Sequence, residues 1–295
     1  MKLSIVTITF NDLKGLAVTR QSICKQTFCD YEWIVVDGGS TDGTKEFLEE
    51  HNKEIAWWCS EPDQGVYSAQ NKGTCHAKGE YCIYMNSGDT FHSCDVLEKL
   101  FKEETCADVI YGNWVFVYAD GKTWKLSAPR IVDMAFFFDS NICHQAMLIK
   151  TELLLRRPYD ESMKIYGDWD EWIELYMQGA KFEYRDVIVC DFLFGGLSTD
   201  ESSKTLKNKR KAEIELLHKR YYAEPWQSTM ARVVPILHEY KALKSWQDEG
   251  GMTSNERKLF SEKRKKHNKI IRVLIYVCCL LLTANIATIL YILYR

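Results

Sequence analysis

Apolar, strand-like runs alternate with helical segments over residues 1–90. The strand-like runs lie at residues 3–10, 31–37, 55–60 and 80–85, and the helical segments lie at 16–26, 45–52 and 66–79. Because these strands read as unbroken apolar runs, they are typical of a parallel sheet that helices cover on both faces. The pattern predicts an α/β fold with a mostly parallel central sheet.

The rest of the chain mixes strands and helices without a repeating unit. The pattern predicts a hairpin at 107–118 and 122–127 around Asp120-Gly121, a strand from 141 that runs into a helix near 150, an amphipathic helix at 167–179, a strand at 182–196 and charged helices over 203–262. We expect the first domain to end near residue 200. The charged helical extension then covers residues 201–269.

Residues 273–291 contain no charged side chain. This length matches the roughly 20 residues of a membrane-spanning helix. The basic run EKRKKHNK at 262–269 precedes it and predicts a cytoplasmic location for the preceding domain. We therefore expect one transmembrane helix at 270–294. A buried core helix and a helix lying in the membrane plane are the alternatives.

Composition narrows the classes of function. The 295 residues carry a formal net charge of −3, which excludes the global basic footprint of a nucleic-acid-binding domain. The 11 cysteines include no C-x-x-C pair, so we expect reduced thiols. No G-x-G-x-x-G motif follows the first strand, which argues against a nicotinamide dehydrogenase.

Polar residues follow each of the first four predicted strands. In a parallel sheet, ligands bind where the carboxyl ends of the strands meet. Asp37 ends the second strand within VVDGGSTDGT, where Gly38 allows a ligand to approach closely. An ordinary capped turn explains Ser40 and Asp42 equally well. The later run EPDQGVYSAQNKG fits either a ligand site or a surface helix start.

The stretch MNSGD ends the fourth strand with a carboxylate, Asp89. Mg²⁺ and Mn²⁺ prefer hard oxygen ligands and need few protein carboxylates when a diphosphate supplies other oxygens. Gly88, beside Asp89, leaves room for a phosphate. A plain turn remains the alternative for this motif taken alone.

The four motifs in this order resemble family 2 inverting glycosyltransferases. They are T-x-T-F-N, V-V-D-G-G-S-T-D-G-T, E-P-D-x-G-x-Y-x-A-x-N-K-G and M-N-S-G-D. The resemblance covers about residues 1–200 and implies the nucleotide-diphospho-sugar transferase (GT-A) fold. It is closest to bacterial cell-surface polysaccharide enzymes of the colanic-acid type.

The resemblance implies a role for each matching residue. Thr7, Thr9 and Phe10 would line the base pocket, Asp37 and Asp63 would contact base and ribose, Asn71 would assist, Ser87 and Gly88 would lie at the phosphates, and Asp89 with His144 would hold Mg²⁺ or Mn²⁺. Two departures weaken the expected metal site. Gly38 replaces a second acid, and Ser87 replaces the first acid of the D-x-D motif.

The stretch GDWDEW resembles the family's acceptor-side E-D motif, with Gly167 at the Glu position and Asp168 as the general base. Inverting transfer needs a carboxylate that removes the acceptor hydroxyl proton. Asp170 projects from a different side of the helix, at about 200° from Asp168. For Asp170 and Glu171 we expect an interaction with the helix dipole instead.

The implied function is transfer of a sugar from a nucleotide-diphosphate sugar to a hydroxyl of a membrane-associated glycan or lipid-linked acceptor, in cell-surface polysaccharide synthesis. A bacterial inner-membrane, single-pass protein with a cytoplasmic catalytic domain would suit this reaction. The alternative is a non-catalytic membrane-anchored scaffold, or a nucleotide-sugar-binding protein, that retains the fold.

Overall fold

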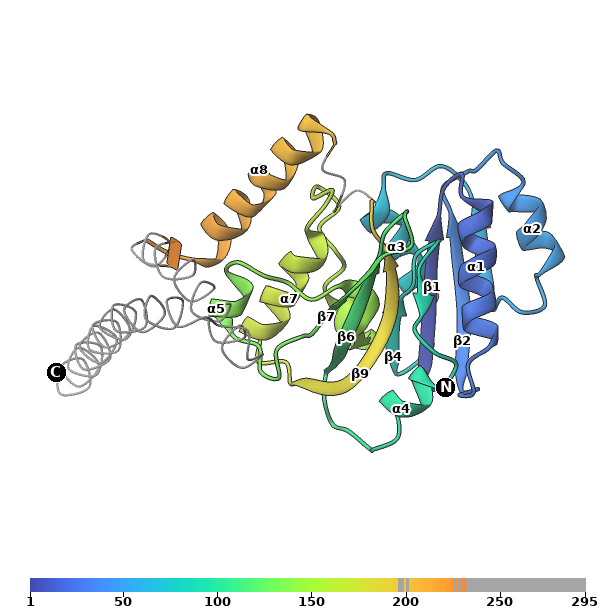
Figure 1. Cartoon of the computed structure of the whole chain (residues 1–295), viewed down its shortest axis with the longest axis horizontal. Coiled ribbons are helices and arrows are strands. Elements are labelled where there is room, and N and C mark those ends of the chain that lie inside the picture. Colours follow the sequence, from blue (N-terminus) through green and yellow to red (C-terminus); the bar gives the residue numbers. More distant parts are fainter. Residues whose placement is uncertain (196–198, 200–201, 225–226, 228–229, 232–295) are drawn as a thin grey trace, which may run out of the picture. The chain divides into compact units, whose positions relative to one another are not determined.

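The strands and helices of the first half form where the sequence predicts them (Figure 1). The computed structural model describes residues 1–195, 199, 202–224, 227, 230 and 231. The first elements are β1 (Leu3–Thr9), α1 (Leu13–Cys24), β2 (Tyr31–Asp37), α2 (Thr44–Glu50), β3 (Trp57–Ser60), α3 (Val66–Thr74) and β4 (Tyr81–Tyr84). Each strand contributes apolar side chains to one core, which α1 covers with Leu16 and Ile23.

The second half begins with short elements and ends with the long helix α8. In order they are β5 (Thr90–Phe91), α4 (Val96–Leu100), β6 (Val109–Val117), β7 (Thr123–Leu126), α5 (Met134–Phe137), the 3₁₀ helix η1 (His144–Ala146), β8 (Met147–Lys150), α6 (Thr151–Arg156), α7 (Gly167–Met177), β9 (Phe182–Leu193) and α8 (Lys204–Tyr221). The strand expected from residue 141 begins only at Met147. The 3₁₀ turn before it frees His144 and Gln145 from strand pairing.

The sheet is mixed rather than mostly parallel, which corrects the expectation. Its order in the described part of the chain is β3-β2-β1-β4-β8-β6-β9-β5, and β7 pairs with β6. The pairs among β1 to β4 are parallel, whereas β8 runs antiparallel to both β4 and β6. The β6–β7 hairpin reverses the chain again, because a tight turn can only join antiparallel strands.

The parallel register gathers the ends of the first strands at one edge of the sheet. Thr9 lies beside Asp37, and Asp37 lies beside Ser60. The chain after β4 continues along β1, since the backbone N–H of Ser87 donates to the carbonyl of Ile8 at 3.0 Å. The prediction that the polar clusters meet at one edge is therefore confirmed.

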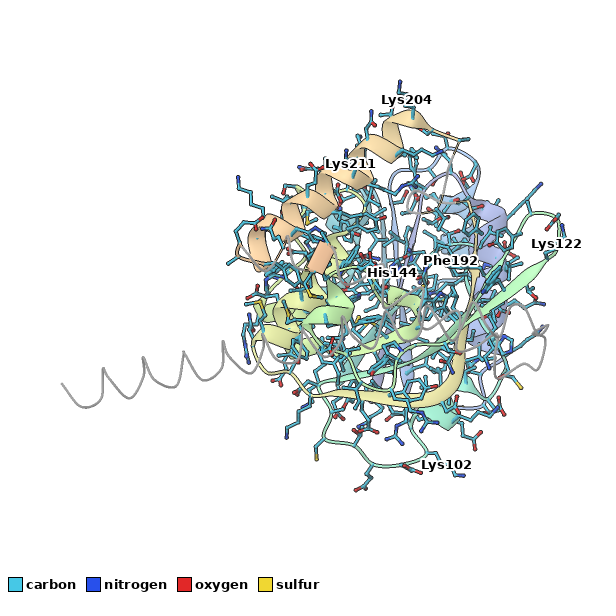
Figure 2. All side chains as sticks on the ribbon, turned by 60° about the vertical axis from the view of Figure 1, so that its left-hand side comes forward. Lys102, Lys122, His144, Phe192, Lys204 and Lys211 are labelled. Carbon is cyan, nitrogen blue, oxygen red and sulfur yellow. The ribbon has the colours of Figure 1, made fainter. Side chains whose placement is uncertain are left out.

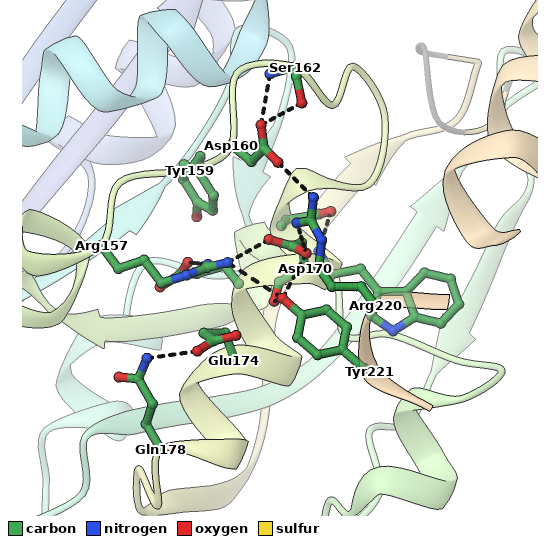
Figure 3. Close-up of polar contacts among 12 residues, drawn as sticks. Arg157, Tyr159, Asp160, Ser162, Asp170, Glu174, Gln178, Arg220 and Tyr221 are labelled. Carbon is green, nitrogen blue, oxygen red and sulfur yellow. Dashed lines mark hydrogen bonds and ion pairs between the residues drawn. The ribbon is translucent and has the colours of Figure 1, made fainter. Parts of the chain in front are cut away.

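Arg220 of helix α8 joins a network of ion pairs around two buried acids of α7 (Figure 3). The Asp170 carboxylate has no solvent exposure, and it pairs with Arg157 at 2.7 Å and with Arg220 at 2.6 Å. Glu171, which is equally buried, pairs with Arg157. These acids therefore bind arginines from elsewhere in the chain. The sequence predicted only an interaction with the helix dipole for them.

The chain divides into two compact units, Met1–Ala223 and Glu224–Arg295. Within the described residues, no helix has the length and apolar character needed to cross a membrane. The transmembrane helix predicted at 270–294 lies outside those residues, as does the charged extension beyond residue 231. The nine cysteines of the described part are free thiols.

Glu171 gives the folded chain a predicted dependence on pH. Burial raises the pKa of Glu171 from 4.5 to about 7, and its Oε1 has no partner among the described residues. The folded chain thus binds this proton more tightly than the unfolded chain does. The contribution of this carboxyl group to stability is therefore greatest below the unfolded pKa and decreases as the pH rises to about 7.

We expect the variant Glu171→Gln, which cannot ionise, to lack this decrease. Thermal unfolding followed by circular dichroism between about pH 5 and pH 8 should show the variant gaining stability relative to the wild type as the pH rises. Glu152→Gln, at an exposed position on α6, serves as the control. Parallel pH curves for wild type and Glu171→Gln would contradict the assignment.

Candidate active site

A cavity of ≈ 570 Å³ lies where the chain after β4, the end of β9 and the start of α7 meet. This volume is within the range of small-molecule sites. The wall contains both Asp89 and Asp168, two residues that the sequence marks as chemically important. Figure 2 labels His144 and Phe192, two further members of this wall.

Asp89 lies just after β4 and is 5% exposed. Its Oδ2 accepts from Gln145 Nε2 at 2.6 Å, and its Oδ1 accepts from the backbone N–H of Leu193 at 3.2 Å. Burial raises the pKa of Asp89 to about 6, although the hydrogen bond from Gln145 acts in the opposite direction. The carboxylate is thus held in a fixed orientation at the edge of the cavity.

Asp168, in the first turn of α7, is held by three donors. Its Oδ1 accepts from the backbone N–H of Trp169 at 2.8 Å and from the hydroxyl of Tyr67 at 3.3 Å. Its Oδ2 lies 3.2 Å from Nδ1 of His144. Because each carboxylate oxygen can accept more than one hydrogen bond, Asp168 can still accept a proton from a ligand in the cavity.

His144 contacts Asp168 directly, and a short chain of polar side chains holds His144 in place. Nδ2 of Asn86 lies 2.9 Å from Nε2 of His144, and Oδ1 of Asn86 accepts from Gln70 Nε2 at 3.5 Å. With Nε2 of His144 accepting from Asn86, Nδ1 is the ring nitrogen that donates to Asp168. Both ring nitrogens of His144 are thereby engaged.

Packing against Tyr67 explains why position 167 is a glycine. A Cβ at this position would lie 2.8 Å from Cε2 of the Tyr67 ring, closer than real Cβ contacts. The Tyr67 ring is buried, and its hydroxyl donates to the carbonyl of Ile165 at 2.7 Å. Tyr67 therefore occupies the space that a Glu at position 167 would need.

A second group of predicted residues lies around Gly38. Phe10 is 64% exposed, which is unusual for so large an apolar ring. A Cβ at position 38 would lie 2.9 Å from Oδ2 of Asp63 and 3.2 Å from the ring of Phe10. Gly38 therefore allows Phe10 and Asp63 to approach each other. Next to Phe10, the buried hydroxyl of Thr9 has no partner among the described residues.

Three predicted site residues bind other parts of the protein instead. The buried Thr7 hydroxyl accepts from Nε1 of Trp33 at 2.9 Å. The Asp37 carboxylate accepts from the hydroxyls of Ser40 and Ser60, so the strand-end acid finds its donors within the fold. The Asn71 side chain pairs with the backbone of Tyr159.

The turn after β4 is fixed by α1. The backbone N–H of Gly88, which has a φ of +92°, donates to Oγ1 of Thr19 at 3.0 Å. Oγ of Ser87 donates to Oδ2 of Asp12 at 2.8 Å. Asp12 thus brings a carboxylate close to Ser87, where the family pattern has an acid. The described residues contain no cluster of three or more His, Cys, Asp or Glu side chains arranged to hold a metal ion.

The sequence did not reveal the aromatic side of the cavity. Trp114 and Phe116 on β6 and Phe192 and Phe194 from the end of β9 line it. The ring centroid of Phe116 lies 5.4 Å from those of Phe192 and Phe194. Strands alternate their faces, but only the pairing of β6 with β9 shows which rings meet.

Lys164 is the other residue that sequence reasoning missed. Its ammonium group donates to the backbone carbonyls of Glu161 at 2.7 Å and Gln64 at 3.2 Å. Within the described part of the chain it makes no ion pair with a carboxylate, although it lines the cavity.

Comparison with known proteins points to one family. The profile described as Glycosyl transferase family 2 matches residues 4–167. A PGL/p-HBAD biosynthesis glycosyltransferase of Mycobacterium bovis is 30% identical over 206 residues, which cover 66% of this chain and 78% of that protein.

Solved structures share the fold at lower sequence identity. S. aureus TarS in complex with UDP-GlcNAc has a TM-score of 0.59 and 18% identity, covering 78% of this chain and 69% of that chain. A mannosyltransferase of Pyrobaculum calidifontis in complex with GDP-Man and Mn²⁺ has a TM-score of 0.53 and 16% identity, covering 89% and 84% of the two chains.

We expect Gly167→Ala to destabilise the protein by about 1–3 kcal/mol, as overpacking of a buried site does. A glycine-to-alanine change in a helix otherwise stabilises by up to about 1 kcal/mol, so the sign of the effect is informative. Urea unfolding would measure it. In a Tyr67→Ala background the same change should cost close to nothing, and an equal cost in both backgrounds would contradict the steric explanation.

Proposed function

The chain belongs to glycosyl transferase family 2 and is a glycosyltransferase, and from this premise we propose that it moves a sugar from a nucleoside-diphosphate sugar to a hydroxyl of a lipid-linked or glycan acceptor, with inversion at the anomeric carbon. The observation that carries the proposal is the presence of Asp89 and Asp168 in the wall of one cavity. In this proposal Asp89 would lie at the diphosphate, and Asp168 would face the entering acceptor hydroxyl.

The donor would bind along the ends of β1, β2 and β4. The exposed ring of Phe10 and the Oδ2 of Asp63 would contact base and ribose, and the unpartnered hydroxyl of Thr9 would gain a hydrogen bond there. Ser87 and Gly88 would lie at the diphosphate. Complexes of TarS with UDP-GlcNAc and of the mannosyltransferase with GDP-Man support a nucleotide-sugar donor.

Asp168 would act as the general base. The donors from His144, Tyr67 and Trp169 hold its carboxylate without occupying all of its lone pairs. As the acceptor oxygen attacks the anomeric carbon and the bond to the diphosphate breaks, Asp168 takes the hydroxyl proton. Lys164, in the same wall, would balance negative charge on the departing nucleoside diphosphate.

A divalent cation fits the chemistry of Asp89. Among the described residues each Asp89 oxygen accepts one hydrogen bond and keeps a lone pair, and carboxylate oxygens suit Mg²⁺ or Mn²⁺. His144 fits less well, because both of its ring nitrogens are engaged. When bound, the ion would neutralise charge on the diphosphate. The Mn²⁺ complex of the mannosyltransferase supports this assignment.

The acceptor would carry an apolar group beside its reactive hydroxyl. Phe116, Phe192 and Phe194 form an apolar wall in the cavity that contains Asp168. A lipid-linked sugar has the matching chemistry, since burying one apolar group on such a wall contributes about 1.5–3 kcal/mol.

The proposed location is the cytoplasmic face of a bacterial inner membrane, with residues 270–294 as a single-pass anchor. Exposed lysines on the first half of α8 support a nearby anionic surface, and each would contribute about 1 kcal/mol. Figure 2 shows Lys204 and Lys211 projecting from this helix.

We expect Asp168→Asn to lower kcat by roughly 10²–10⁴, because the amide cannot take the acceptor proton. Release of nucleoside diphosphate from a panel of nucleotide sugars, with lipid-linked and alkyl-glycoside acceptors, measures this loss. Binding of the donor, followed by isothermal titration calorimetry, should be nearly unchanged. Asp120→Asn, on the exposed β6–β7 turn, is the control.

Full activity in Asp168→Asn would remove this residue from the mechanism. Donor binding without transfer in the wild-type protein, across the whole panel, would favour the non-catalytic alternative.

We expect Phe116→Ala to raise the KM for an octyl glycoside about tenfold, which corresponds to about 1.4 kcal/mol of lost apolar contact. The KM for the methyl glycoside of the same sugar should stay the same, since it lacks the chain. Initial-rate kinetics with both acceptors would test this. Phe28→Ala, which removes a ring stacked on Phe101, is the matched control. An equal change for both glycosides would contradict an apolar acceptor site.

A further inference from the structure

Three consecutive backbone N–H groups bind one carboxylate of α8. Oε1 of Glu213 accepts from the N–H of Lys164 at 2.8 Å. Oε2 of Glu213 accepts from the N–H groups of Ile165 and Tyr166 at 3.0 and 2.8 Å. Hydrogen bonds to a charged acceptor are stronger than those between neutral groups, so this side chain is a strong constraint on residues 164–166.

Residues 164–166 form part of the cavity wall and lead directly into α7. Lys164, Ile165 and Tyr166 all line the cavity beside Asp168. Tyr166 is the N-cap residue of α7, and its side chain makes no capping hydrogen bond to the helix. A carboxylate is favourable near a helix N-terminus, where the dipole is positive. Glu213 therefore stabilises the backbone at the point where the helix carrying Asp168 begins.

The same segment also fixes a direct partner of Asp168. The carbonyl of Ile165 accepts from the Tyr67 hydroxyl at 2.7 Å, and that hydroxyl lies 3.3 Å from Oδ1 of Asp168. A shift of residues 164–166 would therefore move both the start of α7 and the Tyr67 hydroxyl.

Helix α8 is itself held in place, so Glu213 acts from a fixed support. Arg220 pairs with Asp170 at 2.6 Å and with Asp160 at 3.1 Å, and the Tyr221 hydroxyl donates to Asp170 at 2.8 Å (Figure 3). Asp170 belongs to α7, so the two helices are joined at two points along α8. The family match ends at residue 167, before α8 begins.

We propose that Glu213 is a positioning residue for the transfer reaction and that α8 is thereby a working part of the active site. The carboxylate acts through residues 164–166: it sets the start of α7, the direction of Asp168 and the place of the Tyr67 hydroxyl. This inference rests on the proposed role of Asp168 as the base.

The test compares Glu213→Ala and Glu213→Gln with the wild-type full chain. The expected kcat of Glu213→Ala is roughly 10- to 100-fold lower, because a displacement of about 1 Å at a reacting group costs up to 10²-fold. The donor KM should change less than about threefold, since the contacts proposed for base, ribose and diphosphate at Phe10, Asp63 and Asp89 lie outside residues 164–166, and Lys164 acts on charge that develops only as the diphosphate departs. Glu213→Gln should recover part of the activity, because its amide oxygen still accepts from the backbone.

Glu215→Ala is the matched control on the same helix. Glu215 is exposed, and it forms an ion pair with Lys211 at 3.9 Å. Its kcat should stay within about twofold of the wild type, as surface ion pairs contribute little.

Hydrogen–deuterium exchange gives a second readout that needs no activity. Amides 164–166 should exchange faster in Glu213→Ala and keep their protection in Asp168→Asn. If the wild type transfers no sugar, this measurement still tests the positioning role separately from the proposed function. An unchanged kcat, unchanged exchange at 164–166, or exchange that rises equally across the whole chain would each overturn the proposal.

Discussion

The parallel pairing of β1 with both β2 and β4 is the constraint on which the rest of the molecule depends. Leu3, Ile5 and Val6 have no solvent exposure, and burial of such side chains stabilises the pairing by about 25 cal/mol per Å². A slip of one residue would turn every side chain of β1 to the opposite face. The register thus fixes where Phe10 and Asp89 leave the sheet, and with them the two ends of the proposed donor site.

The second half of the chain supplies most of the polar and aromatic side chains around the cavity. The 3₁₀ turn supplies His144 and Gln145, the end of β9 supplies the Leu193 N–H and aromatic rings, and α7 supplies Asp168. All three segments lie more than 50 residues after Asp89 in the chain. Hydrogen bonds between them hold two carboxylates in defined orientations, which is the preorganisation that catalysis by fixed charges requires.

The departures from the family pattern have steric explanations. At position 38 a side chain would meet Asp63 and Phe10, and at position 167 it would meet the buried ring of Tyr67. Each missing acid therefore leaves space that another functional side chain occupies. Near Ser87 the structure places a carboxylate by other means, since Asp12 accepts directly from the Ser87 hydroxyl.

Sequence alone determined the strands and helices of residues 1–90 and the meeting of their polar ends at one edge. Those features follow from local periodicity and from the rule that parallel strands share a carboxyl edge. The motifs that resemble the family single out Asp89 and Asp168, and the roles of these two residues stay predictions. The roles within the site could not be deduced in the same way. Asn71 and Thr7 lie in the matching motifs, yet the structure shows their side chains bound within the fold.

Tertiary structure alone decided that β8 runs antiparallel, that His144 orients Asp168, and that Glu213 supports α7. Each of these depends on a contact between residues far apart in the chain. Local patterns report which face of an element is apolar. They do not report which distant donor satisfies a buried carboxylate, because that partner is selected only when the chain is packed.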